Sequence, residues 1–340
     1  MAAKGKAEKV TNLKELMEKY NDNTLIQGDY VHDNGDRIPS GSLKLDYALG
    51  WHKDNPNGGW PCGKVVEIFG PEGSGKTTLT VHALANAQKK FKDRMVALID
   101  TESSFNLEYA AKYSGLVKES FYKANPDSAE KALELLRDIV SSNSFSAIAI
   151  DSIAGLVPQL QLEAEIGSSP QMAARARLLS DLLPQIAKLA ADNQTTVFLV
   201  NQERSNIGSM GYGPKDITTG GKAIRYYTSV RADISRIGSV QNGEDVIGNK
   251  TKIKIVKNKT APPMKEVEFD IIYGEGVDGL GEILDLGIEM EVVKKKGAGY
   301  YTIGSKTVQG RPEAKRTLLE EKEIYDKIYN GFVAQFSKED

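Results

Sequence analysis

Cysteine and histidine are scarce in this sequence, and their scarcity excludes several kinds of site. Cys62 is the one cysteine among 340 residues, so no disulfide can form within the chain. With one cysteine and the three histidines His32, His52 and His82, a Cys/His zinc cluster cannot be assembled. Apolar residues make up 40% of the chain, which is enough for a sizeable core. The sequence therefore predicts a protein of a reducing compartment whose fold rests on apolar packing.

Long apolar runs and a strong excess of one charge are also missing. No run approaches the roughly 18 apolar residues of a membrane span, and the polar stretch 1–12 lacks the apolar segment of a signal peptide. We therefore expect a cytoplasmic protein with no membrane partner. Because the net charge is −2, any nucleic-acid site must be a local patch.

The most informative segment is a complete phosphate-loop motif, G-x-x-x-x-G-K-[ST], between a strand-like and a helix-like run. It consists of Gly70, Pro71, Glu72, Gly73, Ser74, Gly75, Lys76 and Thr77. Its glycines let backbone N–H groups turn toward a phosphate, and the following helix N-terminus adds a partial positive charge. Lys76 can reach the β- and γ-phosphates, and the Thr77 hydroxyl can bind Mg²⁺. The motif predicts binding of a nucleoside triphosphate.

Apolar strand candidates alternate with helical stretches after residue 38. The strands are expected at 64–69, 95–100, 146–151 and 195–200, and the helices near 77–91, 128–141 and 172–192. This pattern predicts a mostly parallel sheet with helices on both faces. Runs at 229–237, 251–257 and 265–273 have no helices between them and are expected to extend the same sheet as antiparallel strands.

The two ends of the chain are expected to lie outside this core. Residues 12–20 have the apolar spacing of a short helix that packs either on its own core or on a neighbouring subunit, and the sequence leaves both open. We divide the chain into an N-terminal helix and linker (1–37), an ATPase core (38–278) and a small α+β domain (279–340).

Acidic residues follow two of the expected strands. Asp151 ends its strand where a carboxylate can hold Mg²⁺ through water beside Thr77. Hydrolysis also needs a group that orients the attacking water. Glu102 follows a strand at the carboxyl edge of the sheet, next to the phosphate loop, and its position favours it over Asp100 and Glu163.

Two long polar connections, 161–172 and 201–221, leave the same edge of the sheet. Gln202 begins the second and is placed to touch a γ-phosphate and to transmit its presence to that loop. The alternative is a flexible surface loop without such a role.

Lysines recur along one later strand, at Lys252, Lys254, Lys257 and Lys259. We expect alternation to place all four on one face, where Arg231 nearby would favour phosphate binding. The alternative is a solvated edge that the lysines protect from strand pairing.

The order and spacing of these motifs resemble those of the bacterial RecA recombinases from about residue 38 to 310. The matching segments are 70–78, 100–102, 151–152, 165–167, 201–202, 218–221, 257–259 and 273–276. The resemblance implies an α/β fold with a RecA-type phosphate-loop ATPase core, a mostly parallel central sheet with antiparallel additions, an N-terminal helix and a small α+β C-terminal domain.

The resemblance also implies ATP and Mg²⁺ as ligands. Lys76 and Thr77 would hold phosphate and metal, Asp151 would support the metal, and Glu102 would activate water. Further nucleotide contacts would come from Thr78, Tyr109, Tyr273 and Gly274. Lys257 and Lys259 would reach the ATP of an adjacent subunit, as arginine fingers do in other phosphate-loop enzymes.

The two polar loops correspond to the DNA-binding loops of the family. Their implied single-strand contacts are Met172, Arg177, Arg204, Ile207, Gly220 and Gly221. Lys252 and Lys254 match the secondary site for the incoming duplex.

The activity implied is that of an ATP-dependent recombinase in DNA repair and the SOS response. It would form a helical filament on single-stranded DNA, admit double-stranded DNA, exchange strands, and hydrolyse ATP on DNA stimulation. Repressor and loader proteins would be further partners. A hexameric DNA helicase motor and a non-catalytic ATP-gated DNA-binding scaffold are the alternatives. Glu102 argues against the scaffold, and the N-terminal helix with the paired lysines argues against a closed ring.

Replacing Arg204 tests the second DNA-binding loop. We expect Arg204→Ala to weaken binding to single-stranded DNA and to lower the slope of log affinity against log salt by about one, because one phosphate contact is lost. Fluorescence anisotropy with a labelled oligonucleotide at several salt concentrations measures both quantities. Unchanged affinity and slope would remove this loop from the DNA path.

Overall fold

The computed structural model describes residues 35–50, 58–164, 172–205, 216–218 and 221–336. The expected helix at 12–20 and the sites Ile207 and Gly220 lie outside these ranges. The residues in these ranges belong to one compact unit.

A mixed sheet of ten strands forms the centre of the described residues, with the order β12-β11-β10-β9-β3-β7-β6-β4-β5 and with β8 paired to β7. The parallel strands are β3 (Val65–Gly70), β4 (Met95–Asp100), β5 (Phe121–Ala124), β6 (Phe145–Asp151), β7 (Thr196–Ser205) and β9 (Val230–Asn242). The antiparallel strands are β8 (Asp216–Thr218), β10 (Asp245–Asn258), β11 (Glu266–Ile272) and β12 (Gly276–Val277). The predicted α/β sheet with antiparallel additions is confirmed.

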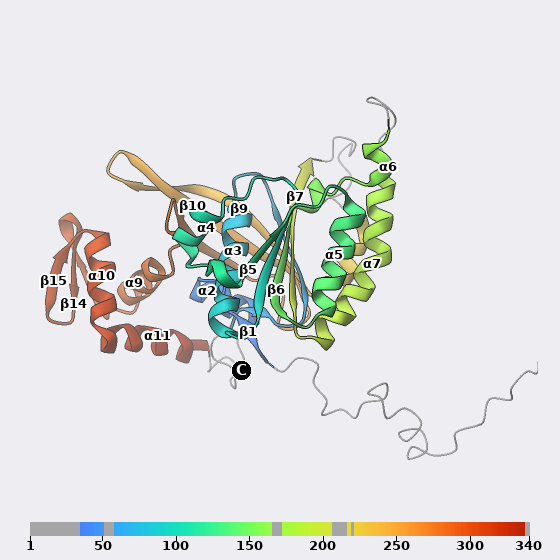
Figure 1. Ribbon diagram of the computed structural model, residues 1–340. Coiled ribbons are helices and arrows are strands. Elements are labelled where there is room, and N and C mark those ends of the chain that lie inside the picture. The colour runs from blue at the N-terminus through green and yellow to red at the C-terminus, as the bar shows by residue number, and fades with distance from the viewer. Residues whose placement is uncertain (1–34, 51–57, 165–171, 206–215, 219–220, 337–340) are drawn as a thin grey trace, which may run out of the picture. The chain divides into compact units, whose positions relative to one another are not determined.

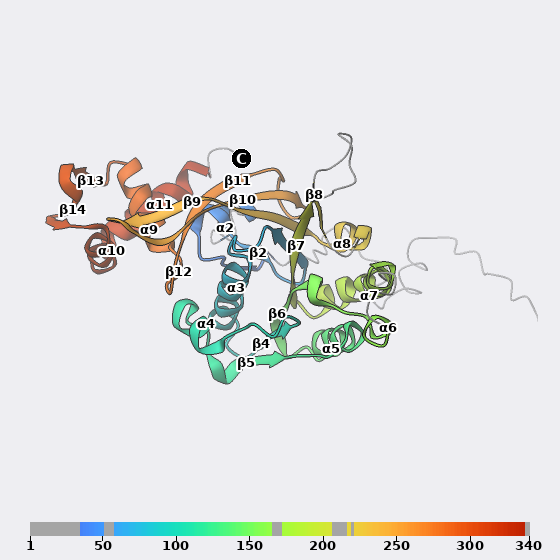
Figure 2. The ribbon, with the colours of Figure 1, turned by 90° about the horizontal axis from the view of Figure 1, so that it is seen from above.

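Helices cover both faces of this sheet, as Figures 1 and 2 show. α3 (Lys76–Lys90) and α4 (Leu107–Ser114) lie on one side, and α5 (Ala129–Ser141) and α7 (Met172–Asp192) lie on the other. Every residue of β3 is buried, as expected for a central strand covered on both faces. The remaining elements of the core are β1 (Arg37–Ile38), α2 (Leu43–Gly50), β2 (Trp60–Pro61), α6 (Gln159–Leu162) and α8 (Gly221–Tyr227), with 3₁₀ turns at Lys118–Ser120 and Ile153–Gly155.

The C-terminal residues form a small α+β domain with its own apolar core. Its elements are α9 (Gly279–Glu289), β13 (Val293–Lys296), a 3₁₀ turn (Gly297–Gly299), β14 (Tyr300–Ile303), β15 (Lys306–Gln309), α10 (Arg311–Glu320) and α11 (Lys322–Phe336). Leu284, Ile303, Leu318 and Ile328 are fully buried in that core. This agrees with the predicted fold class for the C-terminal part.

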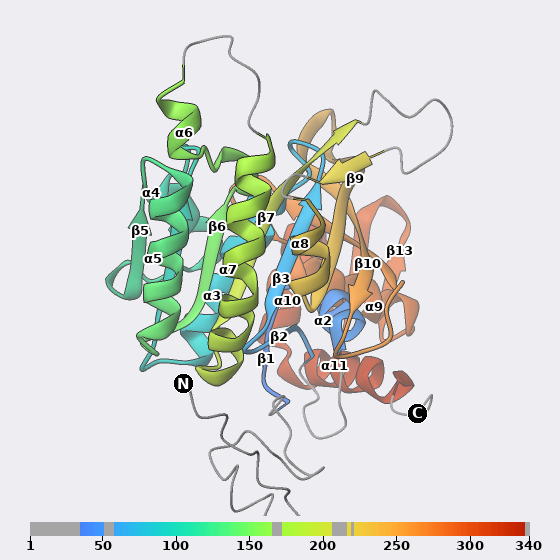
Figure 3. The ribbon, with the colours of Figure 1, turned by 90° about the vertical axis from the view of Figure 1, so that its right-hand side faces the viewer.

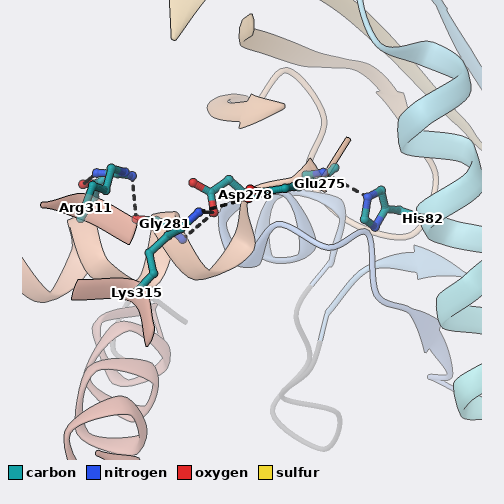
Figure 4. Close-up of polar contacts among 8 residues, drawn as sticks. His82, Glu275, Asp278, Gly281, Arg311 and Lys315 are labelled. Atoms are coloured by element: carbon teal, nitrogen blue, oxygen red, sulfur yellow. Dashed lines mark hydrogen bonds and ion pairs between the residues drawn. The ribbon is translucent and has the colours of Figure 1, made fainter. Parts of the chain in front are cut away.

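Polar contacts hold the junction between core and C-terminal domain (Figure 4). Asp278 caps α9 by accepting from the backbone N of Gly281 at 2.9 Å, and Lys315 of α10 donates to the same carboxylate at 3.0 Å. On the core side, the Nε2 atom of His82 on α3 accepts from the backbone N of Val277 at 3.0 Å. The segment that leads into the C-terminal domain is thus fixed to the helix that follows the phosphate loop.

Two expectations about the sheet are corrected. The run near 229–237 forms β9, which pairs parallel with β3 and antiparallel with β10, so on this side of the sheet antiparallel pairing begins between β9 and β10. The connection 201–221 is not structureless at its ends, because β7 extends to Ser205 and pairs with β8, with Glu203 opposite Thr218. Backbone pairing between segments this far apart leaves no periodic signal in a polar sequence.

The lysines of β10 share a face for a different reason from the one expected. Simple alternation would place Lys254 and Lys257, three residues apart, on opposite faces. A register shift between Ile255 and Lys257 inserts one extra residue, so Lys257 pairs with Arg231 while Ile255 pairs with Ala232. This β-bulge brings Lys257 back into phase with Lys252 and Lys254. The strand ends at Asn258, before Lys259.

The buried His82 predicts a pH-dependent loss of stability. Burial and, to a smaller extent, the charge of Lys89 lower the pKa of His82 from 6.5 to about 4. As the pH falls, the histidine is therefore protonated in the unfolded state before it is protonated in the folded state. The contribution of neutral His82 to the free energy of unfolding is intact above pH 6.5 and is lost as the pH falls toward 4. We expect this loss to reach about 3 kcal/mol at pH 4.

The variant His82→Gln keeps an acceptor for Val277 but does not titrate. Urea unfolding of both proteins between pH 7 and 4 isolates the histidine, because other groups contribute equally to each. The variant should lose less stability on acidification; parallel curves would contradict the prediction.

Candidate active site

The phosphate loop joins β3 to α3 and depends on glycine at two positions. A Cβ at Gly70 would lie 2.0 Å from the backbone O of Ile234, and one at Gly75 would lie 2.4 Å from Cδ1 of Ile271. Gly75 also has a φ of 98°, in the left-handed region, just before the first residue of α3. The loop thus closes tightly against the sheet and leaves the N-terminus of α3 facing the site, where an anion is favoured.

Lys76 is a buried cation next to several carboxylates. Its Nζ donates to the backbone O of Gly70 at 3.0 Å and of Pro71 at 2.6 Å. Burial lowers the pKa of Lys76, whereas the nearby charges of Asp151 and Glu102 act in the opposite direction. The amine is therefore held at the mouth of the loop, where phosphate oxygens can replace the carbonyl partners.

Thr77 and Asp151 meet although they are 74 residues apart. The Thr77 hydroxyl donates to Oδ2 of Asp151 at 2.6 Å. The pKa of Asp151 is raised to about 6, chiefly by burial; the Thr77 hydrogen bond opposes this shift and the charge of Glu102 adds to it. Two oxygen donors thus lie together at the N-terminus of α3.

This donor set fits Mg²⁺. Within the described residues, no group of three or more His, Cys, Asp or Glu side chains could hold a metal by itself. Mg²⁺ needs few protein ligands, because it keeps several waters and binds substrate phosphates. The hydroxyl of Thr77 and the carboxylate of Asp151 are sufficient for that mode of binding.

Glu102 is held by two residues from other strands. Nε2 of Gln202 donates to its Oε1 at 3.1 Å, and the Ser152 hydroxyl donates to the same atom at 2.5 Å. Gln202 lies on β7, opposite Gly70 of β3, and Ser152 follows β6, so the contacts depend on the sheet. The structure therefore brings together the expected water-orienting acid and the expected γ-phosphate contact. Ser152 was not predicted as a site residue.

The two rival acids have other partners. Asp100 is 2% exposed and accepts from the backbone N of Glu102 and Phe105 at 3.2 and 3.1 Å, and it pairs with Lys123 at 2.9 Å. Burial alone would raise the pKa of Asp100, but these hydrogen bonds and the charge of Lys123 hold it below its ordinary value. Glu163 accepts from Gln159 at 2.7 Å and does not line the cavity beside Lys76.

A cavity of about 320 Å³ connects these groups. The predicted residues that line it are Glu72, Gly73, Gly75, Lys76, Thr77, Thr78, Glu102, Tyr109, Asp151, Gln202, Tyr273 and Gly274. At one end the Tyr109 hydroxyl accepts from the backbone N of Gly274 at 3.1 Å. Tyr109 and Tyr273 are each 52% exposed, which leaves their rings available to a base.

Sequence reasoning missed several lining residues. Tyr113, Ser152, Asn249, Ile271 and Ile272 also line the cavity. Tyr113 could have been found, since it lies four residues after Tyr109 on the same helix. Asn249 could not, because it reaches the cavity only through the pairing of β10 with β11.

The expected DNA-side residues lie on elements at the edge where β7 ends (Figure 3). Met172 begins α7, Arg177 is exposed on that helix, Arg204 pairs in register with Ile217, and Gly221 begins α8.

The lysines of β10 lie outside the cavity. Lys252 and Lys254 both pair with Glu266 of β11, the second at 2.9 Å. Nζ of Lys257 donates to the backbone O of Tyr226 at 3.2 Å at the end of α8, and Lys259 is exposed. Arg231 pairs in register with Lys257 and so shares its face, but its side chain is 12% exposed and paired with Glu67, so it adds little free positive charge there.

Comparison with known proteins assigns the family. Residues 8–278 match the RecA N-terminal domain and residues 281–336 match the RecA C-terminal domain. The chain belongs to the RecA family. Proteins named Protein RecA from Chloroherpeton thalassium, Campylobacter lari and Bifidobacterium longum are 45%, 40% and 40% identical to it. The matches cover 86%, 93% and 98% of this chain and 79%, 89% and 81% of those relatives.

Membership of the RecA family defines the activity of this chain. It is an ATP-dependent recombinase, a DNA-dependent phosphate-loop ATPase of DNA recombination and repair. The helicase and scaffold alternatives find no support in these matches. Among the described helices, none has both the length and the apolar character needed to cross a bilayer.

The different partners of Asp100 and Glu102 predict different effects of replacing them. Asp100→Asn removes a buried charge from Lys123 and should lower the free energy of unfolding by about 2 kcal/mol. Glu102→Gln, at an exposed side chain, should change it by less than about 0.5 kcal/mol. Urea unfolding at pH 7 measures both. Equal effects would show that Asp100 does not organise the turn at 101–105.

Proposed function

We propose that this chain binds ATP with Mg²⁺ in the cavity between the phosphate loop and Tyr273, and hydrolyses it when assembled on single-stranded DNA. The observation that supports the proposal is a cluster of charged and polar side chains at one edge of the sheet. There Lys76, the Thr77–Asp151 pair and the Gln202–Glu102 pair all line one cavity. These are the groups that phosphoryl transfer to water requires.

Each group has a distinct part in the reaction. The loop backbone and Lys76 bind the phosphates, and Thr77 and Asp151 hold the metal site. Mg²⁺, when bound, neutralises charge on the β- and γ-phosphates. Glu102 orients a water and accepts its proton on a carboxylate oxygen as the water attacks the γ-phosphorus. The bond from this phosphorus to the bridging oxygen breaks, and ADP leaves with the electron pair. Tyr109, Tyr273 and Gly274 hold the base.

Gln202 is proposed to transmit the presence of the γ-phosphate to the second polar loop, 201–221, which is expected to bind DNA. Its amide already bonds to Glu102, and its strand continues directly into Arg204. A γ-phosphate that competes for this amide would shift the end of β7 and with it the loop.

The remaining roles concern assembly. Met172, Arg177, Arg204, Ile207, Gly220 and Gly221 would contact single-stranded DNA, and Lys252 and Lys254 would receive the duplex. Their pairing with exposed Glu266 is weak in water and can yield to phosphate. Lys257 and Lys259 would complete the ATP site of a neighbouring subunit in a helical filament.

We extend the proposal to the organisation of the chain. Residues 1–37 would form the assembly helix and linker, 38–278 the ATPase core and 279–340 the C-terminal domain. Repressor and loader proteins would be further partners, in the cytoplasm.

The central test is Glu102→Gln. This variant should bind ATP with an affinity close to that of the parent, because Glu102 contacts water rather than phosphate. Its DNA-stimulated turnover should fall by at least about a hundredfold, the contribution typical of a general base. Turnover is measured by phosphate release and affinity with a fluorescent ATP analogue. As a matched control, Glu163→Gln should retain full turnover. Unchanged hydrolysis in Glu102→Gln would overturn the assignment.

A further inference from the structure

A carboxylate lies in the middle of the sheet, on the strand that leads into the phosphate loop. Glu67 of β3 is fully buried, and the residues beside it, Val66 and Ile68, are apolar. It points to the same face as Val65, which packs under α7 and α8 (Figure 3). A charge at such a place is costly unless it is paired and hydrogen-bonded.

Both oxygens of Glu67 have partners on the neighbouring strands. Nε of Arg231 on β9 donates to Oε2, and Nδ2 of Asn201 on β7 donates to Oε1 at 2.8 Å. The Arg231 guanidinium lies over the ring of Phe69, 4.6 Å from its centre, which fixes its plane. The carboxylate thus ties three adjacent strands together.

On the β7 side the contacts continue into the ATP cavity. Oδ1 of Asn201 accepts from the backbone N of Gln202 at 2.9 Å. The side chain of Gln202 in turn donates to Glu102 at 3.1 Å. Asn201 and Gln202 therefore connect Glu67 to Glu102, the residue proposed to orient water. Glu67 does not itself line the cavity.

On the β9 side the contacts lead to Lys257, which does not line the cavity. Arg231 pairs in register with Lys257 across the bulge. Lys257 donates to the backbone O of Tyr226, in the last turn of α8, the helix that follows the second loop. Burial lowers the pKa of Lys257, and the charges of Lys259 and Arg231 also lower it. The charge of Arg231 therefore acts on the Lys257 amine.

We propose that the buried Glu67–Arg231 ion pair positions Gln202 relative to Lys257, so that the ATP cavity and the face that meets a neighbouring subunit keep one fixed geometry. Neither residue touches the nucleotide; both act through the residues beside them. The inference rests on the roles proposed above for Gln202, Glu102 and Lys257.

Stability alone does not account for such a pair. A protein in which an apolar pair of similar size replaces a buried ion pair is often as stable as the parent. Removal of only one partner, in contrast, leaves the other charge buried and unpaired. A purely structural role therefore predicts that an apolar double variant restores both fold and activity. A positioning role predicts that it restores the fold only.

The experiment compares the single variant Glu67→Leu with the double variant Glu67→Leu/Arg231→Met. We expect the single variant to be destabilised and the double variant to regain the urea midpoint of the parent. In the double variant the KM for ATP should stay within about twofold, while DNA-stimulated kcat falls by about tenfold to a hundredfold, as for displaced catalytic groups. Recovery of the parental kcat together with stability would overturn the proposal.

A second variant decides the matter if the double variant does not fold. Arg231→Lys keeps the charge but loses the planar group over Phe69 and the Nε donor. We expect a folded protein whose kcat falls at least about threefold at unchanged KM; the kcat of the parent would overturn the proposal.

Two further proteins complete the comparison. Asp285→Leu/Arg311→Met removes a pair between α9 and α10, joined at 2.6 Å and without contact to Glu67, and should keep the parental kcat. A tenfold loss there would show that kcat responds to any lost ion pair, which would overturn a specific role for Glu67. Glu102→Gln in the same assay separates the two hypotheses: activity in that variant refutes the proposed function, whereas loss there with normal Glu67 variants refutes only this inference.

Discussion

The parallel register of the four central strands is the constraint on which the site depends. Gly70 of β3 pairs with Gln202 of β7, and Asp100 of β4 pairs with Asp151 of β6. Because parallel strands end at the same edge, this register places the phosphate loop, Asp151 and Gln202 side by side. A shift of one residue in β7 would turn Gln202 to the opposite face and break its bond to Glu102.

Burial of charge gives this edge its chemistry. Lys76 and Asp151 both have pKa values shifted by burial toward their neutral forms; nearby carboxylates oppose the shift of Lys76, and the Thr77 hydrogen bond opposes that of Asp151. Groups held in this way respond strongly when a polyanion and a divalent cation enter, since in a low-dielectric site Coulomb interactions are less screened than in water. Asp100 contributes differently, because hydrogen bonds and Lys123 stabilise its charged form and it organises the turn that presents Glu102.

The cavity beside Lys76 and the surfaces proposed to meet DNA and neighbouring subunits are built on the same strands. β7 carries Gln202 and runs on to Arg204, and β10 carries Asn249 in the cavity as well as the lysines. Glu67 and Arg231 lie between those two strands. Because the two strands that flank this pair each carry residues of the cavity and residues of those surfaces, a shift of either strand would alter both, which is the physical basis of the proposed link between ATP and assembly.

The sequence by itself determined the local features: the phosphate loop, the strands that precede Gly70, Asp100 and Asp151, and the helices that cover them. Glycine spacing, apolar runs and the ends of strands are properties of contiguous residues, so they can be read without a structure. Tertiary structure alone decided what contiguous residues cannot specify. Ser152 and Asn249 enter the site through strand pairing, the β-bulge restores Lys257 to the lysine face, and β8 closes the base of the second loop. Arg231, expected on the surface, turns inward because Glu67 at the centre of the sheet needs a partner. These outcomes depend on register and on burial across the sheet, which are set by residues far apart in the chain.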